Sequence, residues 1–337
     1  MNSMRGSISK VYSNQYIILF TLAGFLTISA MVALILGSYK ISLSEVIFGQ
    51  ISELSETVLF QIRAPRVIFS MFAGASLALS GACLQGLFRN PLADPGLIGV
   101  SSGGALGVAL AIVLLSDYIP TEFNPYILPI SAVIGSAFVI TILFHITKGF
   151  GYASMTYMLL AGIAINAFSG VGIGFLTYIS DDSELRNLTF WTMGSFGGAS
   201  WKLILPALII IFLTIIWSLK IARKLDLIQL GESEAQRLGV NIRKIRSDII
   251  ISSAIIVGLS VALAGIIGFI GLIIPHLVRM IGGVNHHFLL KGSILAGALI
   301  MILSDLISRI IIQPAEMPVG LITSAIGSPF FLWLIFK

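Results

Sequence analysis

The sequence predicts an all-α protein that crosses a membrane about ten times. Of its 337 residues, 57% are hydrophobic and only 10% are charged, and the mean hydropathy is +1.01. So little polar surface cannot cover a water-soluble fold. Apolar runs of the roughly 20 residues that a spanning helix needs recur from Tyr16 to Lys337. We therefore expect a single membrane domain over residues 1–337, without a separate soluble domain.

The apolar runs give ten predicted spans, of which the eighth is short. They cover about residues 16–37, 67–87, 97–115, 126–147, 157–179, 203–220, 249–270, 272–282, 292–312 and 319–336. The first run could be taken for a signal peptide, but it is too long, so we interpret it as an uncleaved span. With both termini in the cytoplasm, the positive-inside rule is obeyed, because fourteen of the 20 Lys and Arg residues face inward and the others are Lys40, Arg63, Arg66, Arg186, Lys202 and Arg309.

A weak internal repeat predicts two halves, about 1–180 and 181–337, of five helices each. A shift of 184 residues gives eight identities, with Gly74–Gly81 over Gly258–Gly265, Pro91 over Pro275 and Gly99-Val100 over Gly283-Val284. Five predicted spans separate the two copies, so the copies run in opposite directions, which is the inverted repeat of many transporters.

Glycines and prolines interrupt the apolar run in both copies. They are Gly86, Pro91, Pro95 and Gly96 in the first copy and Gly268, Gly271 and Pro275 in the second. Broken backbone at membrane depth is tolerated only where protein buries it or where it lines a water-filled path. The breaks therefore indicate a transport path, and ordinary turns between helices are the alternative.

The residues offer little for catalysis or metal binding. Cys83 is the single cysteine and lies in an apolar segment, which leaves no spacing for a zinc or iron–sulfur site. Asp305 is the only carboxylate inside a confident span, whereas an intramembrane enzyme would need several polar groups there. We expect no catalytic residue and no metal site, and we interpret the four histidines as structural or solvated rather than as haem ligands.

The only long polar segment on the predicted cytoplasmic side runs from Lys220 to Arg246. Its centre, Gly231-Glu-Ser-Glu-Ala-Gln-Arg-Leu-Gly-Val240, predicts a short amphipathic helix. Ser233 is the expected cap, Ala235 and Leu238 form one apolar face, and Gly239 ends the helix. A solvated connecting loop is the alternative.

This segment resembles the coupling helix of FecCD-type permeases, the ABC importer subunits for haem, iron siderophores and cobalamin. The resemblance continues in order along nearly the whole chain. Its further motifs are Arg63-Ala-Pro-Arg66, Arg89-Asn-Pro-Leu-Ala-Asp-Pro-Gly-Leu-Ile-Gly-Val-Ser-Ser-Gly103, Phe190-Trp-Thr-Met-Gly-Ser-Phe-Gly-Gly198, Gly268-Phe-Ile-Gly-Leu-Ile-Ile-Pro-His276 and Glu316-Met-Pro-Val-Gly320.

The resemblance implies a type II ABC importer permease fold in the cytoplasmic membrane. It also implies a dimer with a second copy of the chain, two ATP-binding subunits and an extracytoplasmic substrate-binding protein. The sequence contains no Gly-Lys dipeptide and hence no phosphate loop of the Walker type. The chain itself is therefore expected to bind no cofactor, with ATP and Mg on the partner subunits, and we expect no nucleic-acid partner.

Three sets of residues receive roles from the resemblance. Gly231, Glu232, Ala235, Arg237, Leu238 and Gly239 are expected to face the ATPase, and Arg63, Arg66 and Arg309 resemble the arginines that receive glutamates of the binding protein. Exposed cations can orient an acidic partner in this way, although arginines at the end of a span also serve as headgroup anchors. Asn90, Leu92, Met155 and Thr156 occupy positions that resemble the cytoplasmic gate.

Met193 and Phe196 lie in the outer Trp-Thr-Met-Gly-Ser-Phe stretch and are the candidates for contact with a flat apolar substrate. Packing or a place in the aromatic belt is the alternative for both residues. We expect a permease that imports haem and does no covalent chemistry itself, with a ferric siderophore or cobalamin as the alternative substrate. A channel or ion-coupled carrier is the rival function, and it would work without an ATPase.

Overall fold

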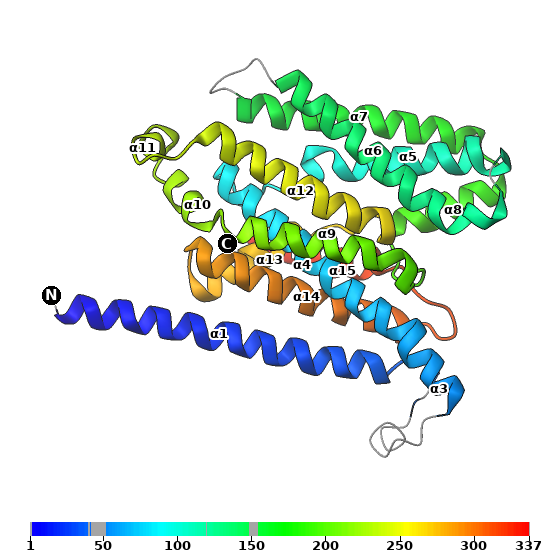
Figure 1. The fold of residues 1–337 in the computed structure, drawn as a ribbon, viewed down its shortest axis with the longest axis horizontal. Helices are drawn as coiled ribbons and strands as arrows, with labels where there is room; N and C mark the ends of the chain where they lie inside the picture. Colours follow the sequence, from blue (N-terminus) through cyan, green and yellow to red (C-terminus); the bar gives the residue numbers. More distant parts are fainter. Residues whose placement is uncertain (1, 40, 42–51, 119, 148–153, 337) are drawn as a thin grey trace.

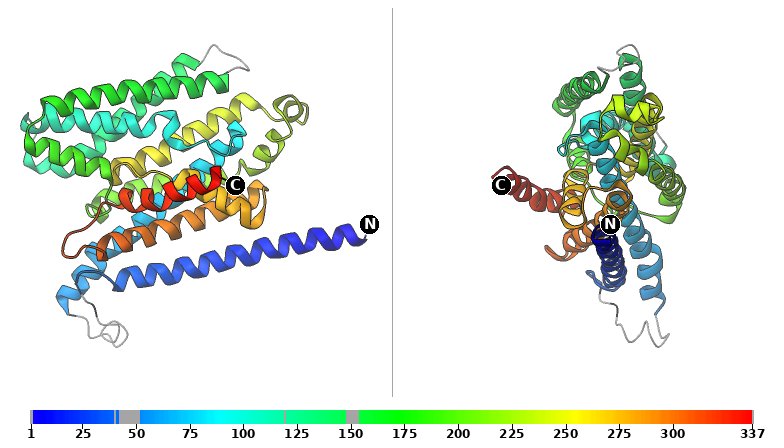
Figure 2. Two further views of the ribbon diagram at one scale, coloured as in Figure 1. Left: turned by 180° about the vertical axis from the view of Figure 1, so that it is seen from behind. Right: turned by 90° about the vertical axis from the view of Figure 1, so that its left-hand side faces the viewer.

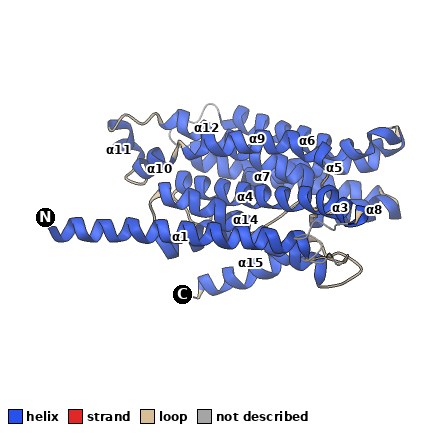
Figure 3. Ribbon diagram, turned by 60° about the horizontal axis from the view of Figure 1, so that its bottom comes forward, coloured by secondary structure: helices blue, strands red, loops and turns tan. Residues whose placement is uncertain are grey.

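The computed structural model describes residues 2–39, 41, 52–118, 120–147 and 154–336, and every regular element in this part of the chain is a helix (Figure 3). The helices are α1 (Asn2–Ile35), α3 (Glu53–Thr57), α4 (Ala64–Phe88), α5 (Val100–Leu110), α6 (Asn124–Thr147), α7 (Ser154–Ile179), α8 (Asp182–Met193), α9 (Trp201–Leu219), α10 (Ala222–Ile228), α11 (Glu232–Arg237), α12 (Ile242–Ala264), α13 (Ile270–Gly282), α14 (His286–Ile310) and α15 (Val319–Ile335). Short π turns (Val58–Arg63, Ala111–Leu115) and 3-10 turns (Pro95–Ile98, Ser116–Tyr118, Thr121–Phe123) connect some of them.

Helices are found at all ten predicted spans. Within the described residues, seven helices are long and apolar enough to cross a membrane, and three shorter apolar helices occupy 100–115, 270–282 and 319–333. The short eighth span is α13. The first predicted span, 16–37, agrees with the apolar part of α1, Asn14–Ile35, although the helix itself begins at Asn2. One predicted boundary is wrong: the span predicted over 67–87 is the inner part of a continuous helix from Glu53 to Phe88.

The long helices lie side by side, and both chain termini are at the same end of the bundle (Figures 1 and 2). We call this end the α11 end, because α10 and α11 lie there, and we call the opposite end the α8 end. α5, α6, α7 and α8 form one flank, while α1 lies along α14 on the other (Figure 1).

α4 is the central helix of the bundle. Of its most apolar window, 83% is buried inside the chain, against 11% for α1 and 17% for α7. α4 contacts α9, α12, α13 and α14, all of which belong to the other predicted half. The two halves are therefore interlocked, and α1 and α7 keep their apolar surfaces for lipid or another chain.

Glycines set how closely α4 approaches its neighbours. A Cβ atom on Gly74 would lie 2.3 Å from the carbonyl oxygen of Gly297 on α14, and one on Gly81 would lie 1.8 Å from that of Gly271 on α13. Both distances are too short for any side chain. The backbones therefore touch directly at these two crossings, as small residues allow in membrane proteins.

The two predicted breaks have different forms. α12 ends at Ala264, and α13 begins only at Ile270, after Gly265 (φ +74) and Phe269 (φ +68) in left-handed conformations. α4 instead runs on to Phe88 before the chain turns. α4 and α12 do run in opposite directions (Figure 1), but the fixed 184-residue offset does not hold past the break, because Pro275 lies inside α13 whereas Pro91 lies in a loop.

Substitution of Gly74 by Ala should destabilise the bundle. The added methyl group cannot fit between α4 and α14, and overpacking of this kind costs about 1–3 kcal/mol. Thermal unfolding of the purified protein in detergent measures the loss. Gly24→Ala on α1 is the matched control, because nothing lies within 4 Å of the Cβ position at Gly24, and an unfolding temperature equal for the two variants would contradict the close crossing.

Candidate functional site

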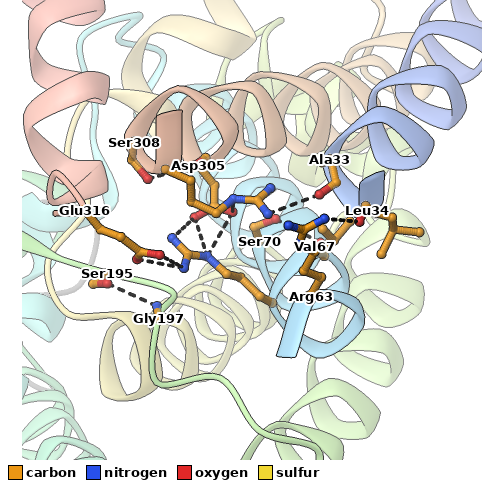
Figure 4. Close-up of polar contacts among 12 residues, drawn as sticks. Ala33, Leu34, Arg63, Val67, Ser70, Ser195, Gly197, Asp305, Ser308 and Glu316 are labelled. Atoms are coloured by element: carbon orange, nitrogen blue, oxygen red, sulfur yellow. Dashed lines mark hydrogen bonds and ion pairs between the residues drawn. The ribbon is translucent and has the colours of Figure 1, made fainter. Parts of the chain in front are cut away.

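Three arginines and two carboxylates gather at the α8 end (Figure 4). Arg66, at the start of α4, donates from Nε to both carboxylate oxygens of Asp305 at 2.9 and 3.2 Å, and from Nη1 to both oxygens of Glu316 at 2.9 and 2.8 Å. Arg309 lies one helical turn after Asp305 on α14, with its Nε 3.3 Å from Asp305 Oδ2. We call these residues, together with Arg63, the arginine cluster. It joins α4, α14 and the segment before α15.

The cluster also holds the end of α1. Arg63 Nη1 donates to the carbonyls of Leu34 and Ile35 at 3.0 and 2.5 Å, and Arg309 Nη1 donates to that of Ala33 at 3.1 Å. These carbonyls lie in the last turn of the helix, where no further N–H group of the helix can reach them. Positive charge is also favoured at a helix C-terminus by the helix dipole.

The expectation that these arginines are exposed cations is wrong. Arg63, Arg66 and Arg309 are 5%, 6% and 4% exposed, because Asp305 and the end of α1 supply their partners. The four-residue spacing of Asp305 and Arg309 could have predicted their ion pair, because residues four apart lie on one face of a helix. No feature of the sequence predicted the ion pair between Arg66 and Asp305. The Glu316 side chain, 42% exposed, is the member of the cluster that an incoming partner can reach.

The stretch that contains Met193 and Phe196 forms a junction of three segments beside the cluster. Ser195 N–H donates to the carbonyl of Ala264 at 2.7 Å, and Val319 N–H donates to that of Gly194 at 3.0 Å. The turn before α9 is thereby tied to the break after α12 and to the start of α15.

Phe196 does not face an open path in this conformation. It is 1% exposed and packs edge-on against Phe69 of α4, with ring centroids 5.5 Å apart. Its ring fills the core here, and the expected substrate contact of Phe196 stays a prediction. Met193 is half-buried at the end of α8.

The sequence analysis missed α8. Its signal was present, since the Asp181 side chain accepts from Glu184 N–H at 2.8 Å and the Glu184 side chain accepts from Asp181 N–H at 3.0 Å. This reciprocal capping box starts a helix in the acidic loop that follows α7.

At the α11 end, the predicted amphipathic helix is α11. It ends as predicted at Gly239, which has φ +84. Gly239 N–H donates to the carbonyl of Gln236, and Val240 N–H donates to the carbonyl of Ala235, both at 2.9 Å. This pair of hydrogen bonds is a Schellman motif. The expected cap is wrong, because Gly231 rather than Ser233 occupies the N-cap position.

Only some of the expected coupling residues face outward. Leu238 is 58% exposed and the Arg237 side chain 77% exposed, whereas Ala235 is fully buried and Glu232, 16% exposed, lies 3.5 Å from Arg246. Ala235 and Leu238 therefore do not form one apolar face. The turn at Gly239 directs Leu238 away from the core that receives Ala235 and Val240.

α10 is attached to the ends of α4 and α14. Gln229 Nε2 donates to the carbonyl of Gly86 at 2.7 Å, and Asp226 Oδ1 accepts from the backbone N–H of His286 at 2.9 Å and lies 2.6 Å from His286 Nδ1. Burial by itself would raise the pKa of Asp226, but the hydrogen bonds from His286 hold the pKa below its usual range. α10 is therefore joined by hydrogen bonds to both α4 and α14.

The gate residues are only partly described. Asn90 follows α4, and its Oδ1 accepts from Leu92 N–H at 2.9 Å, which leaves the Leu92 side chain 47% exposed. Met155 and Thr156 belong to the first turn of α7, but their side chains lie outside the described residues. The two predicted gate layers therefore stay a prediction.

Substitution of Asp305 by Asn should strongly destabilise the protein, because it leaves Arg66 and Arg309 buried beside a neutral group. Removal of one partner of a buried ion pair costs about 3–5 kcal/mol, and the half-exposed Glu316 compensates little because solvent screens it. Thermal unfolding in detergent measures the change. Glu234→Gln, which removes an exposed pair with Arg237, is the control and should have little effect.

Comparisons with known proteins agree with this architecture. A model of the FecCD transport family matches residues 25–337. The hemin transport system permease protein HmuU of Yersinia pestis is 46% identical over 319 residues, which cover 93% of this chain and 95% of that protein. The vitamin B12 import system permease protein BtuC of Vibrio vulnificus is 38% identical over 315 residues, 93% of each chain.

One solved structure has the same fold over nearly the whole chain. It is described as a metal-chelate type ABC transporter in an inward-facing conformation, and it aligns with a TM-score of 0.85 and 37% identity over 95% of this chain and 99% of that one. Because the family match and these alignments cover almost every helix, the chain belongs to the FecCD transport family and is a multi-pass membrane permease with the fold of an ABC importer subunit.

Proposed function

We propose that this chain forms the transmembrane path of an ABC importer that carries haem across the cytoplasmic membrane. The observation that carries the proposal is the 46% identity to a hemin permease over 93% of the chain. The relatives that import vitamin B12 are 38% identical, which makes cobalamin the weaker candidate. A ferric siderophore is the second candidate, since the solved relative is described as a metal-chelate transporter.

The α11 end is proposed to be cytoplasmic. Arg223 and Lys224 of α10 lie there, as do Arg243 and Lys244 in the first turn of α12, and the cytoplasmic side of membrane proteins carries an excess of Lys and Arg. Both termini would then be cytoplasmic. Two ATP-binding subunits, which carry the ATP and Mg, would dock at this end on a dimer of the permease.

The coupling contact is proposed to be made by the exposed face of α11. Arg237 and Leu238 are available to a partner, while Ala235 and Gly239 shape the helix and its end. Force on α11 would pass through α10 to Gly86 and His286. This route uses only the hydrogen bonds that attach α10 to α4 and α14.

The substrate-binding protein is proposed to dock at the α8 end over the arginine cluster. A glutamate of that protein would compete with Glu316 for Arg66, because Glu316 is the exposed carboxylate on that guanidinium. Substrate would then pass Met193 and leave through a gate at Asn90 and Leu92, with Met155 and Thr156 as a second layer.

The substrate is tested by ATP hydrolysis of the assembled complex in lipid vesicles. Haem-loaded binding protein should raise the rate severalfold above the rate with substrate-free binding protein, and haem should accumulate inside the vesicles only with ATP. Stimulation by a ferric siderophore but not by haem would remove haem as the substrate. Transport without ATP would remove the importer mechanism.

Substitution of Leu238 by Asp should weaken the association of the ATP-binding subunit without unfolding the permease. An exposed leucine that inserts into a partner loses its burial energy when it becomes charged, and loss of a buried leucine contact is worth about 2 kcal/mol, or roughly thirtyfold in affinity. Co-purification and ATP-driven transport measure the effect. Leu54→Asp, at an equally exposed leucine (59%) of the α8 end, should leave the association unchanged.

A further inference from the structure

A cavity of about 520 Å³ with several polar and charged side chains in its lining opens at the α11 end. It lies between the last turn of α4, α10, the end of α13 and the start of α14, and its lining includes Arg89, Asp226, Arg279, Asn285 and His286. The lining also includes Gly86 and Gln229, which with His286 belong to the proposed coupling route, and the proposed gate residue Asn90.

Arg279 is held in position for a ligand. Its Nη2 donates to Gln85 Oε1 at 2.6 Å. Gln85 is only 3% exposed, and its Nε2 donates to the carbonyls of Gly271 and Leu272 at 3.3 and 3.1 Å. These bonds fix which end of the amide faces Arg279. The guanidinium has five N–H groups in a rigid fork, and Gln85 is its one acceptor among the described residues.

Arg89 enters the same cavity from a strained backbone position. It has φ 49 and ψ 38 at the end of α4, a left-handed conformation that favours glycine. For a non-glycine residue this conformation costs roughly 1–2 kcal/mol. Strain of this kind concentrates at functional sites.

The lining of the cavity holds two arginines, Arg89 and Arg279, and one carboxylate, Asp226. Neither Arg89 nor Arg279 forms an ion pair with a described carboxylate. Asp226, the carboxylate in the lining, is engaged twice by His286. Two guanidinium groups thus line one cavity. Arg89 is exposed and Arg279 is half-buried, and a half-buried charge without an ion-pair partner is costly.

We propose that this cavity binds an oxyanion, either the headgroup phosphate of an anionic membrane lipid or a carboxylate of the departing substrate. Arginine forks match phosphate and carboxylate geometry. Basic pockets between transmembrane helices on the cytoplasmic side suit lipid headgroups, and the place of Asn90 in the lining puts the pocket beside the proposed exit. The substrate source rests on the proposed function, whereas the lipid source does not.

The test uses the full-length permease in phosphatidylcholine nanodiscs with two probes. Binding of short-chain phosphatidylglycerol is measured by native mass spectrometry, and binding of haem is measured by absorbance titration. Haem dimethyl ester, which lacks free carboxylates, is the control ligand for haem. The variants are Arg279→Gln, Arg89→Gln and Asn285→Asp. Asn285→Asp keeps the cap of α14, since Asp and Asn cap helices equally well, and it adds negative charge to the cavity.

At least one probe should bind the wild-type protein and bind each variant about tenfold more weakly. For Arg279→Gln and Arg89→Gln this is the effect of one lost charge-assisted hydrogen bond, and for Asn285→Asp it is the effect of repulsion between the added carboxylate and the oxyanion. Arg223→Gln, at an exposed arginine of α10 outside the cavity, should bind as wild type. Binding of phosphatidylglycerol would identify the oxyanion as a lipid headgroup. Binding of haem but not of haem dimethyl ester would identify it as a carboxylate of the substrate.

Unchanged binding of both probes to Asn285→Asp and Arg279→Gln, with wild-type unfolding temperatures, would overturn the proposal, and so would the absence of binding to the wild-type protein. If Arg279→Gln does not fold, Asn285→Asp decides. ATP hydrolysis stimulated by haem-loaded binding protein is measured separately, so that failure of the oxyanion site is distinguished from failure of the proposed transport function.

Discussion

The direct backbone contact of α4 with α14 and α13 is the constraint on which the rest of the bundle depends. At Gly74 and Gly81 the space for a side chain is occupied by carbonyl groups of Gly297 and Gly271. Lipid provides no hydrophobic drive between helices, so close packing must hold them together. α4 is buried along its length, and its long polar side chains have their partners at its two ends.

At the α8 end, Arg66 finds Asp305 and Glu316, and Arg63 finds the last carbonyls of α1. At the α11 end, the Gln85 side chain donates to the backbone of α13 and accepts from the guanidinium of Arg279. The carbonyl of Gly86 accepts from Gln229, which directly follows α10. α4 and α14 are therefore fastened by polar contacts at both ends and by glycine contacts between them.

The break between α12 and α13 has a different purpose in the architecture. It leaves the carbonyl of Ala264 unpaired within its own helix, and Ser195 N–H from the turn before α9 supplies the missing hydrogen bond. The start of α15 is attached to the same turn through Gly194. A helix end is thus tolerated within the bundle because three segments satisfy each other's backbone groups.

The sequence by itself determined the ten apolar helices and their order, the short α13, the end of α11 at Gly239 and the family, since each depends on apolar length, on glycine or on residues in a fixed local order. It did not determine that the three arginines of the arginine cluster are buried or that Phe196 fills the core. It also did not determine that Ala235 is buried while Leu238 is exposed, or that Arg89 and Arg279 line the same cavity. Those facts depend on partners such as Asp305, 239 residues after Arg66. Helix packing alone brings such residues together, because the free energy of a buried charge depends on what lies opposite it and not on its neighbours in the chain.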